Sequence, residues 1–254
     1  GAYTARGDLN DVLAVRDAGW IIFLAESNQE VLDSIIMAYR LSEEVMLPSV
    51  VNMNLHADFR EPVHVPQDKK VANFLPQRKA DVKKAAAFNP PVDDYMEFKA
   101  QQLRAMDSAA ATAEKLCARW KEKFGRAYGP VERYMLDDAD YAFVVAGFSA
   151  GTCKAAVDNL RAQGEKAGML RIRMMRPFPG RAAAEALKSA KKAAVVDENI
   201  SLGSSGIIHT ELAQYYHGFS CSFISVGRHL TEKSFADIFL HLKKADAQER
   251  AWLL

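Results

Sequence analysis

The sequence predicts an α/β protein in two parts, with a parallel sheet in the second part. Short continuous apolar runs, typical of strands covered on both faces, begin at residues 20–25 and recur toward the C-terminus. Segments with helical spacing of apolar residues separate these runs, as crossovers between parallel strands require. A stretch without either periodicity, over residues 56–89, divides the two parts.

In the first part, the apolar run over residues 20–25 predicts a buried strand. Ser27 is expected to cap the next helix, and Glu30, three positions later, completes a capping box. Apolar residues at helical spacing carry that helix to Met46. Residues 49–53 then predict a second buried strand, so the first part is an α/β unit that we expect to begin inside a domain.

Residues 56–89 predict an extended connector, because prolines and Lys, Arg and Gln clusters replace any sustained period. Asp93 or Asp94 is expected to cap a long helix that reaches about Phe124. The expected apolar stripe of that helix consists of Met96, Leu103, Met106, Ala110 and Leu116.

In the last part, strands and helices are predicted to alternate, which indicates a parallel sheet. The predicted strands span residues 141–146, 168–173, 193–196 and 221–226. The predicted helices span residues 150–163, 181–190 and 207–216, followed by a terminal helix capped by Thr231 and reaching about Lys244.

Composition excludes several classes of function. With 33 basic and 32 acidic side chains, the net charge of +1 gives no footprint for nucleic acid. No apolar run approaches the roughly 20 residues that span a bilayer, and no signal peptide is recognisable. Cys117, Cys153 and Cys221 are scattered, so the chain is not expected to hold an iron–sulfur cluster. We expect three small buried thiols in a cytoplasmic protein.

Arg16 is the first candidate functional residue, because it interrupts an otherwise apolar helix and a buried guanidinium must be paired. From spacing alone, an internal salt bridge to Asp8, Asp11 or Asp17 is favoured over binding of an external carboxylate. Asp8 and Asp11 are expected to cap a helix. The alternative is that these aspartates and Asn10 fix a loop that orders the arginine.

Polar residues after the second predicted strand form another candidate site. Asn52 and Asn54 follow its end, where ligands gather in α/β domains. A polar group over residues 56–61 contains His56, Asp58, Arg60 and Glu61. Metal binding by this group is conceivable, but a solvated or ion-paired turn is favoured.

The second part contains three turns of uncertain role. Residues 146–152 predict a tight strand-to-helix turn, with a weak signal for phosphate binding. Residues 197–206 could line an interface cleft or make a glycine-rich turn. Residues 176–180 (RPFPG) are expected to stiffen a connection. No set of histidine, serine and aspartate has a recognisable catalytic spacing, which indicates a subunit rather than a complete enzyme.

Taken in order, short landmarks across nearly the full length resemble one family. They are Asp8-x-x-Asp11 with Ala14-x-Arg16-x-x-Gly19, Asn28-Gln29-Glu30, Glu61-Pro62-Val63 with Pro66, Phe74-Leu75-Pro76, residues 94–99 (DYMEFK), residues 123–129 (KFGRAYG), Gly147-x-x-x-Gly151-Thr152, Leu170-Arg171-x-Arg173, Arg176-Pro177-Phe178-Pro179, and Asp197-x-x-x-Ser201-x-Gly203-x-x-Gly206. The chain resembles the alpha subunit of the 2-oxoacid:ferredoxin oxidoreductases, of the pyruvate:ferredoxin oxidoreductase (pyruvate synthase) type.

The resemblance implies an enzyme that oxidatively decarboxylates a 2-oxoacid, pyruvate by default, to acyl-CoA and CO2. It implies thiamine diphosphate shared with a beta subunit, and Mg²⁺ and [4Fe-4S] clusters held by partner subunits. A gamma subunit, a ferredoxin-like subunit and coenzyme A as co-substrate complete the expected assembly. Residues 1–60 would be the rear part of a pyrimidine-type thiamine diphosphate domain, residues 61–126 a connector with a long helix, and residues 127–254 a transketolase C-terminal-like domain.

The resemblance also reverses the interpretation of Arg16, which occupies the position of the family's substrate arginine. It implies that Arg16 binds the substrate carboxylate and that Asp8, Asn10 and Asp11 frame its loop. The sequence departs from the family pattern in two places. The family's N-terminal substrate loop and activating glutamate are absent, so we expect either a fragment or a separately encoded N-terminal half. Residues 52–60 also differ, which leaves aromatic and dicarboxylic 2-oxoacids open.

Two other functions stay open at this point. The chain could be a structural or assembly module, in which Arg16 forms a buried ion pair. It could also be a nucleotide-binding regulatory domain that uses residues 147–152.

Overall fold

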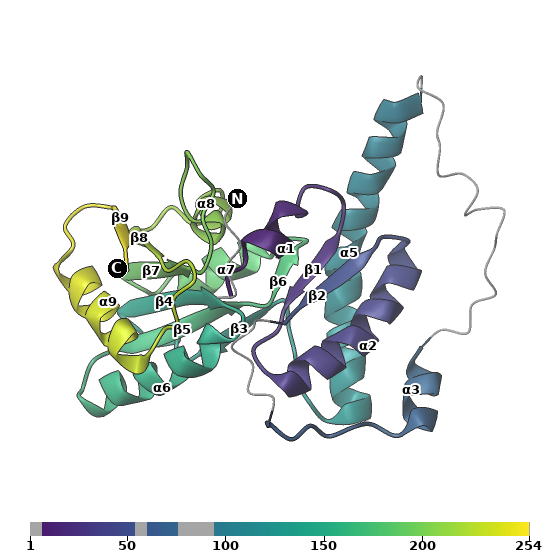
Figure 1. The fold of residues 1–254 in the computed structure, drawn as a ribbon, viewed down its shortest axis with the longest axis horizontal. Coiled ribbons are helices and arrows are strands. Elements are labelled where there is room, and N and C mark those ends of the chain that lie inside the picture. The colour runs from purple at the N-terminus through teal and green to yellow at the C-terminus, as the bar shows by residue number, and fades with distance from the viewer. Residues whose placement is uncertain (1–6, 54–59, 76–93, 254) are drawn as a thin grey trace.

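In the computed structural model, the described residues 7–53, 60–75 and 94–253 form a small and a large sheet (Figure 1). The small sheet has the order β2-β1-β6. Its strands are β1 (Ile21–Leu24), β2 (Ser49–Asn52) and β6 (Met174–Arg176). β1 and β2 are the two strands predicted in the first part, and they pair in parallel, but β2 is half-buried and not buried as predicted. β6 comes from the second part of the chain and is antiparallel to β1.

The large sheet has the order β3-β5-β4-β7-β8-β9. Its strands are β3 (Val131–Tyr134), β4 (Tyr141–Ala146), β5 (Ala167–Ile172), β7 (Lys192–Asp197), β8 (Ser220–Ile224) and β9 (Arg250–Trp252). All neighbours are parallel except β3, which is an antiparallel edge. The four strands predicted in this part are therefore confirmed, while the short strands β3, β6 and β9 were not predicted.

Helices cover both faces of the large sheet, which explains its continuous apolar strands. α6 (Ser149–Ala162) and α9 (Glu232–Lys244) pack on one face, and α7 (Gly180–Leu187) and α8 (Ile207–Leu212) on the other. Along β4, Phe143 packs with the first pair of helices and Val144 with the second. The predicted cap of α9 is confirmed, because the Thr231 hydroxyl accepts a hydrogen bond from the Ser234 amide.

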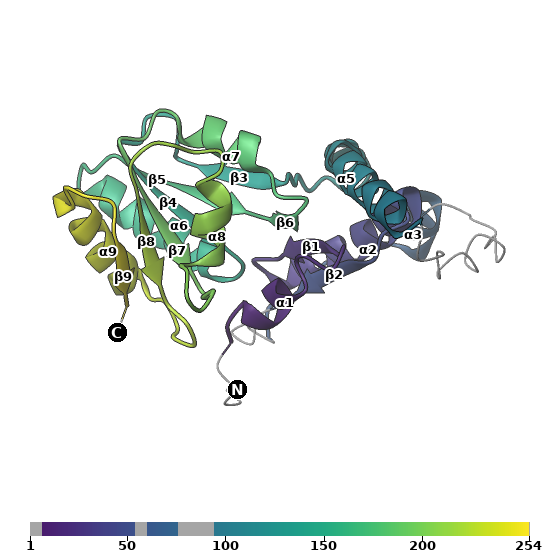
Figure 2. The ribbon, with the colours of Figure 1, turned by 90° about the horizontal axis from the view of Figure 1, so that it is seen from above.

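One strand path connects the two sheets, as the view from above also indicates (Figure 2). β5 runs through Arg173 directly into β6, and the Leu24 amide of β1 donates to the Arg173 carbonyl at 2.7 Å. Ile22 and Leu24 also share a hydrophobic cluster with Val144 of the large sheet. The sheets therefore have a common core, and the fold is of the predicted α/β class.

A buried carboxylate lies where the two sheets meet. Ser27 caps α2 (Asn28–Val45) as predicted, but the Glu30 side chain accepts from the Glu26 amide and not from that of Ser27. The Glu30 carboxylate accepts hydrogen bonds from Arg171 at 2.7 Å and from Arg173. Burial alone would raise the pKa of Glu30, yet the two arginines hold it below its ordinary value.

The region predicted as a connector contains a helix, α3 (Asp68–Phe74), so this prediction was wrong there. Its last residue, Phe74, is buried and packs edge-on against the Trp120 ring at 5.1 Å, and this tertiary contact has no signal in local sequence. Residues 76–89 of the predicted connector lie outside the described residues.

The long helix α5 (Tyr95–Phe124) is confirmed, but its buried face differs from the predicted stripe. Its buried residues are Ala109, Ala113, Leu116, Cys117 and Trp120. Met96 and Leu103, in the N-terminal third of the helix, are exposed. The N-terminal end of α5 extends beyond the small sheet (Figure 1). Asp94 occupies the N-cap position but makes no side-chain capping bond. Among the described residues, no helix combines the length and apolarity needed to cross a bilayer.

We expect Glu30→Gln to lower the free energy of unfolding by about 3–5 kcal/mol, because it leaves the buried Arg173 guanidinium without its carboxylate. Arg171 loses its bond to Glu30 as well but keeps Glu132 at 2.7 Å. Urea unfolding measures this change. Glu185→Gln is the matched control, since Glu185 pairs with Lys188 at the surface and its loss is expected to cost less than about 0.5 kcal/mol. Equal urea midpoints for Glu30→Gln and wild type would contradict the assigned role.

Candidate functional site

The short helix α1 (Asn10–Ala14) is attached to the second part of the chain. Leu9 and Leu13 are buried in the core shared with the large sheet. The Leu9 amide donates to the Glu198 carbonyl at 2.9 Å, and the Asn10 side-chain oxygen accepts from the Ile200 amide at 2.9 Å. Of the predicted site residues, Asn10 therefore anchors α1 to the loop after β7.

Asp8 and Asp11 bond within their own segment. The Asp8 carboxylate accepts from the Asn10 amide at 2.9 Å, and that of Asp11 accepts from the Val12 amide at 2.6 Å. The N-cap residue is Leu9, which makes no side-chain capping bond, so the expected capping by Asp8 or Asp11 was wrong. Asp8 instead tightens the turn that leads into α1, a common use of aspartate before a helix.

Arg16 lies in the turn after α1 and not within the helix, which was expected to include it. One terminal nitrogen, Nη1, donates to the Leu13 carbonyl at 3.0 Å. The other, Nη2, lies 3.5 Å from Asp17, one of the three predicted ion-pair partners. Nε lies 3.7 Å from Glu211 of α8 and has no hydrogen-bond partner among the described residues. The Arg16 guanidinium is thus fixed by one hydrogen bond, from Nη1, while Nε and Nη2 make none among the described residues.

Arg176, at the end of β6, links this turn to α8 through its hydrogen bonds. It donates from Nε to the Arg16 carbonyl at 3.2 Å, and from Nη2 to Glu211 at 2.6 Å and Asp17 at 3.2 Å. Arg16 and Glu211 are largely buried, with side chains 25% and 16% exposed, whereas the Asp17 side chain is 70% exposed. The largely buried Glu211 carboxylate is thus hydrogen-bonded to Arg176, while Arg16 lies beyond hydrogen-bond distance from it and can accept a further anion.

Sequence reasoning missed Glu211 and gave Arg176 only a stiffening role. The available signal was the arginine directly after a buried strand, where ligand sites gather in α/β folds. Glu211 gave no signal, because its approach to Arg16 depends on the fold of α8 against the large sheet.

The Asp197–Asn199 turn holds α8 in place. Asp197 is fully buried and accepts from the amides of Ile208 at 2.8 Å and His209 at 3.2 Å. A Cβ at Gly206 would lie 1.9 Å from an Asp197 oxygen, so only glycine fits there. Burial raises the pKa of Asp197 to about 6, although these hydrogen bonds oppose the rise. Of the two interpretations of residues 197–206, these contacts favour the structural turn.

The polar group after β2 does not assemble a metal site in the described part of the chain. Asn54, His56 and Asp58 lie outside the described residues. Glu61 accepts a hydrogen bond from the Asn28 amide at 2.9 Å, which ties this segment to the start of α2. No three His, Cys, Asp or Glu side chains within the described ranges are arranged to hold a metal ion. The three cysteines are free and buried, as expected.

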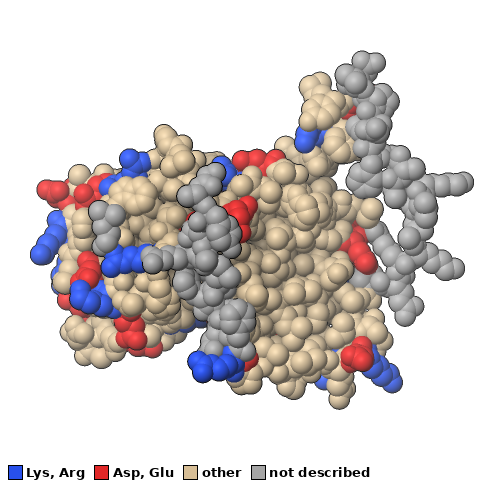
Figure 3. Space-filling view, viewed as in Figure 1, with Lys and Arg blue, Asp and Glu red and all other residues tan. Residues whose placement is uncertain are grey.

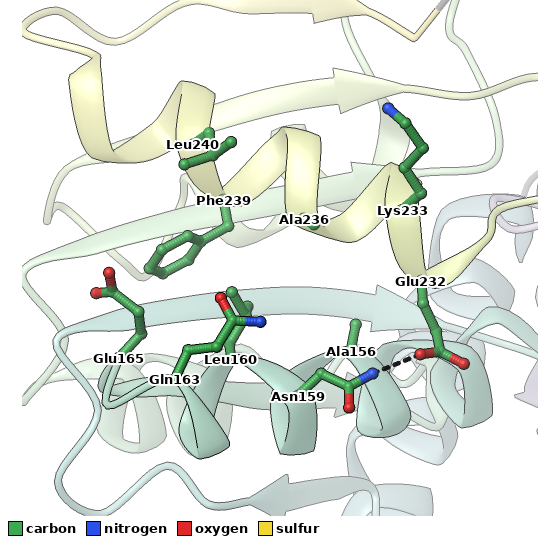
Figure 4. A pocket seen from close by; sticks show the side chains of 10 residues that line it. All are labelled: Ala156, Asn159, Leu160, Gln163, Glu165, Glu232, Lys233, Ala236, Phe239 and Leu240. Carbon is green, nitrogen blue, oxygen red and sulfur yellow. Dashed lines mark hydrogen bonds between the residues drawn. The ribbon is translucent and has the colours of Figure 1, made fainter.

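A groove of about 330 Å³ lies between α6 and α9 (Figure 4). Leu160 and Phe239 contribute apolar lining, and Asn159 donates to Glu232 across it at 2.6 Å. α6 and α9 cover the face of the large sheet opposite α8. The groove is therefore separate from the cluster around Arg16.

Two protein families match this chain. Residues 2–122 match the family described as pyruvate flavodoxin/ferredoxin oxidoreductase, thiamine diphosphate-binding. Residues 139–230 match the pyruvate:ferredoxin oxidoreductase core domain II. The pyruvate synthase subunit PorA of Methanocaldococcus jannaschii is 36% identical over 266 residues, covering 97% of this chain and 68% of the relative. The chain belongs to the 2-oxoacid:ferredoxin oxidoreductase family.

Other members of the oxidoreductase family match with similar identity. PorA of Methanothermobacter thermautotrophicus is 36% identical over 81% of this chain and 56% of the relative. The ketoisovalerate oxidoreductase subunit VorA of Pyrococcus abyssi is 37% identical over 80% of this chain and 54% of the relative. The chain thus spans between about half and two thirds of the length of these alpha-type subunits. Its predicted family is confirmed.

A solved structure of an oxidoreductase has the same fold. It is the 2-oxoglutarate:ferredoxin oxidoreductase from Magnetococcus marinus with 2-oxoglutarate, coenzyme A and succinyl-CoA bound. The TM-score is 0.64 at 12% identity, over 95% of this chain and 47% of that one. At this identity, the likeness concerns the fold alone.

Glu198 is a buried carboxyl in this member of the family. Burial raises its pKa to about 7, although a hydrogen bond with Ser149 opposes the rise, and its Oε1 has no hydrogen-bond partner among the described residues. The folded chain therefore binds this proton more tightly than the unfolded chain, whose ordinary value is 4.5. The stabilisation from the neutral form is complete below about pH 4.5 and is lost as the pH rises through about 7.

Glu198→Gln removes this titration. Relative to wild type, its free energy of unfolding is expected to increase by about 2.5 kcal/mol between pH 5 and pH 8. Urea unfolding at several pH values measures the difference. Glu185→Gln, at an exposed site, is expected to give a difference that does not change with pH. A flat profile for Glu198→Gln as well would show that Glu198 ionises as freely in the folded chain as in water.

Proposed function

We propose that the chain acts in a 2-oxoacid:ferredoxin oxidoreductase, as the alpha-type subunit that binds the carboxylate of the substrate. The reaction is the oxidative decarboxylation of a 2-oxoacid to acyl-CoA and CO2, with ferredoxin as electron acceptor. Pyruvate is the default substrate, and the relatives named for ketoisovalerate keep branched 2-oxoacids open. The observation that carries the proposal is the partly buried, incompletely bonded guanidinium of Arg16.

The site around Arg16 fits a carboxylate. A guanidinium presents parallel N–H donors that match the oxygens of a carboxylate. Within the described part of the chain, Nη1 is the one Arg16 nitrogen that makes a hydrogen bond, and the two nearby carboxylates, Asp17 and Glu211, lie 3.5 Å and 3.7 Å away. Asp8, Asn10 and Asp11 contribute by fixing the start of α1, so that the turn carrying Arg16 holds one position.

The described residues fit the acid end of the substrate better than they fit the cofactor. A diphosphate with its Mg²⁺ needs a set of oxygen ligands, and no such acidic cluster lies within the described ranges. The free cysteines sit on separate elements and offer no site for an iron–sulfur cluster. We therefore assign thiamine diphosphate and its metal mainly to a beta subunit, the [4Fe-4S] clusters to a ferredoxin-like subunit, and coenzyme A to the assembled enzyme.

A partner surface on the first part of the chain supports such an assembly. β2 is the outer strand of the small sheet, and no other described strand pairs with its outer edge. The surface over β1, β2 and α2 carries few charges in the view of Figure 3. Ile35 and Tyr39 of α2 are exposed. We propose that further family sequence, in the same polypeptide or a separate one, completes residues 1–60 as a thiamine-type domain.

The proposed organisation keeps residues 61–126 as a linking segment and residues 127–254 as the domain that binds neighbouring subunits, a gamma subunit among them. The assembly is proposed to act in the cytoplasm, which the three free thiols support. Neither nucleic acid nor a membrane is proposed as a partner.

We expect Arg16→Gln in the assembled enzyme to lower kcat/KM for pyruvate by about 100-fold or more, because it removes a largely desolvated charge from the substrate carboxylate. Steady-state kinetics with ferredoxin measure the change. Arg133→Gln is the matched control, because Arg133 pairs with Asp137 at the surface of β3. Normal kinetics of Arg16→Gln, or loss of assembly without any other defect, would favour the structural role instead.

Native mass spectrometry of the complex purified from its source is expected to show this chain together with other subunits. At least one partner should carry thiamine diphosphate and at least one should carry iron and sulfide, since the described residues of this chain form no metal site and its three cysteines lie on separate elements. A chain that runs alone under conditions in which the activity survives would contradict the proposed assembly.

A further inference from the structure

Glu211 lies between two arginines and is bound by only one of them. Its Oε1 atom is 2.6 Å from Nη2 of Arg176, a short charge-assisted hydrogen bond. The same oxygen is 3.7 Å from Nε of Arg16, beyond hydrogen-bond distance. All three side chains are at least three-quarters buried. In such surroundings, a small movement of the carboxylate would change its main partner.

We propose that Arg176 is a positioning residue that holds Glu211 away from Arg16 and so keeps Arg16 available for the substrate carboxylate. This inference rests on the proposed function of Arg16. Without Arg176, the Glu211 carboxylate would lose its hydrogen-bonded cation, and Arg16 would be the nearest guanidinium left to it. It would then pair with Arg16 and compete with the substrate.

The surroundings of Arg176 support this role, because its donors are directed to fixed acceptors. Nη1 donates to the Met175 carbonyl at 3.0 Å and Nε to the Arg16 carbonyl at 3.2 Å. These two bonds fix the guanidinium of Arg176 between β6 and the turn after α1. Figure 1 shows α1, β6 and α8 next to one another at this position. The Arg176 side chain is thus oriented independently of Glu211, and it can direct that carboxylate.

Glu211 is also held from its own side. α8 begins at the buried carboxylate of Asp197, which bonds the Ile208 and His209 amides. The helix therefore fixes the main chain of Glu211, and its side chain has only a short reach within the cluster. An attached carboxylate of this kind competes at a high effective concentration, so a dissolved 2-oxoacid would displace it poorly.

Asp17 is the other carboxylate near both arginines, at 3.5 Å from Arg16 and 3.2 Å from Arg176. Its side chain is mostly in water, where a charge pair contributes little. Glu211 is the buried competitor, and the control of its position falls to Arg176.

The test is a double-mutant cycle in the assembled enzyme, with pyruvate as substrate. Arg176→Gln keeps a donor for the Arg16 carbonyl but removes the charge that holds Glu211. We expect it to raise KM about tenfold and to change kcat less than about twofold, because binding and not the chemical step is affected. Glu211→Gln alone is expected to lower KM or leave it within about threefold. The double variant is expected to restore KM to within about threefold of wild type.

A binding measurement accompanies the kinetics. Isothermal titration of the complex with oxamate, an unreactive isostere of pyruvate, is expected to give the same pattern of affinities without turnover. Arg133→Gln on β3 serves as the matched control in both measurements.

Two results would overturn the inference. One is a double variant as impaired as Arg176→Gln, which would assign Arg176 a purely structural role. The other is a tenfold rise of KM in Glu211→Gln, which would show that Glu211 supports Arg16 and does not compete with the substrate. The KM of Glu211→Gln tests the inference even if the Arg176→Gln variant does not assemble. Failure of the proposed function can be told apart from failure of this inference. If Arg16 does not bind the substrate, Arg16→Gln has wild-type kinetics and wild-type affinity for oxamate; if only the inference fails, Arg16→Gln is still impaired.

Discussion

The carboxylate of Glu30 determines how the two sheets of this molecule meet. It comes from the first turn of α2, while the guanidiniums that bind it, Arg171 and Arg173, come from the strand path of the large sheet. Arg173 is fully buried and also contacts the Ser34 hydroxyl at 2.7 Å and the Tyr128 ring at 4.7 Å. A buried pair of this kind adds little net stability over apolar residues, but losing one partner is costly. The interaction therefore selects one relative arrangement of the sheets.

That arrangement also builds the candidate site. The strand path that carries Arg171 and Arg173 continues into β6, whose last residue is Arg176. Because the ion pairs with Glu30 fix this path against α2 and β1, they also fix where Arg176 meets the turn containing Arg16. Asn10 supplies the second attachment of that turn, through the Ile200 amide. The site thus depends on contacts that span more than 130 residues of sequence.

Much of the fold follows from sequence periodicity, and the predictions that failed concern contacts between segments far apart in the sequence. The central strands were predictable because both their faces are buried, and the caps at Ser27 and Thr231 because capping is local. The buried face of α5 was not predictable, since small residues such as Ala109 and Ala113 line it where α2 approaches closely. β6 was missed because three residues carry no period, and its pairing with β1 is a long-range event. Family membership was recognisable because many short landmarks keep their order.

The candidate site was predictable only in its local part. Arg16 was identifiable as a charge in an apolar segment, and Asp17 as a neighbour in sequence, but Glu211 lies almost 200 residues away along the chain, in α8. From spacing alone, an internal salt bridge of Arg16 was favoured. The structure has carboxylates near Arg16, those of Asp17 and Glu211, but neither pairs closely with it. Glu211 forms its short bond with Arg176, and Asp17 is in water, where its pairing is weak. A positive charge that has carboxylates nearby, each held at 3.5 Å or more, keeps its position without being fully paired, which is the condition that the proposed role of Arg16 requires.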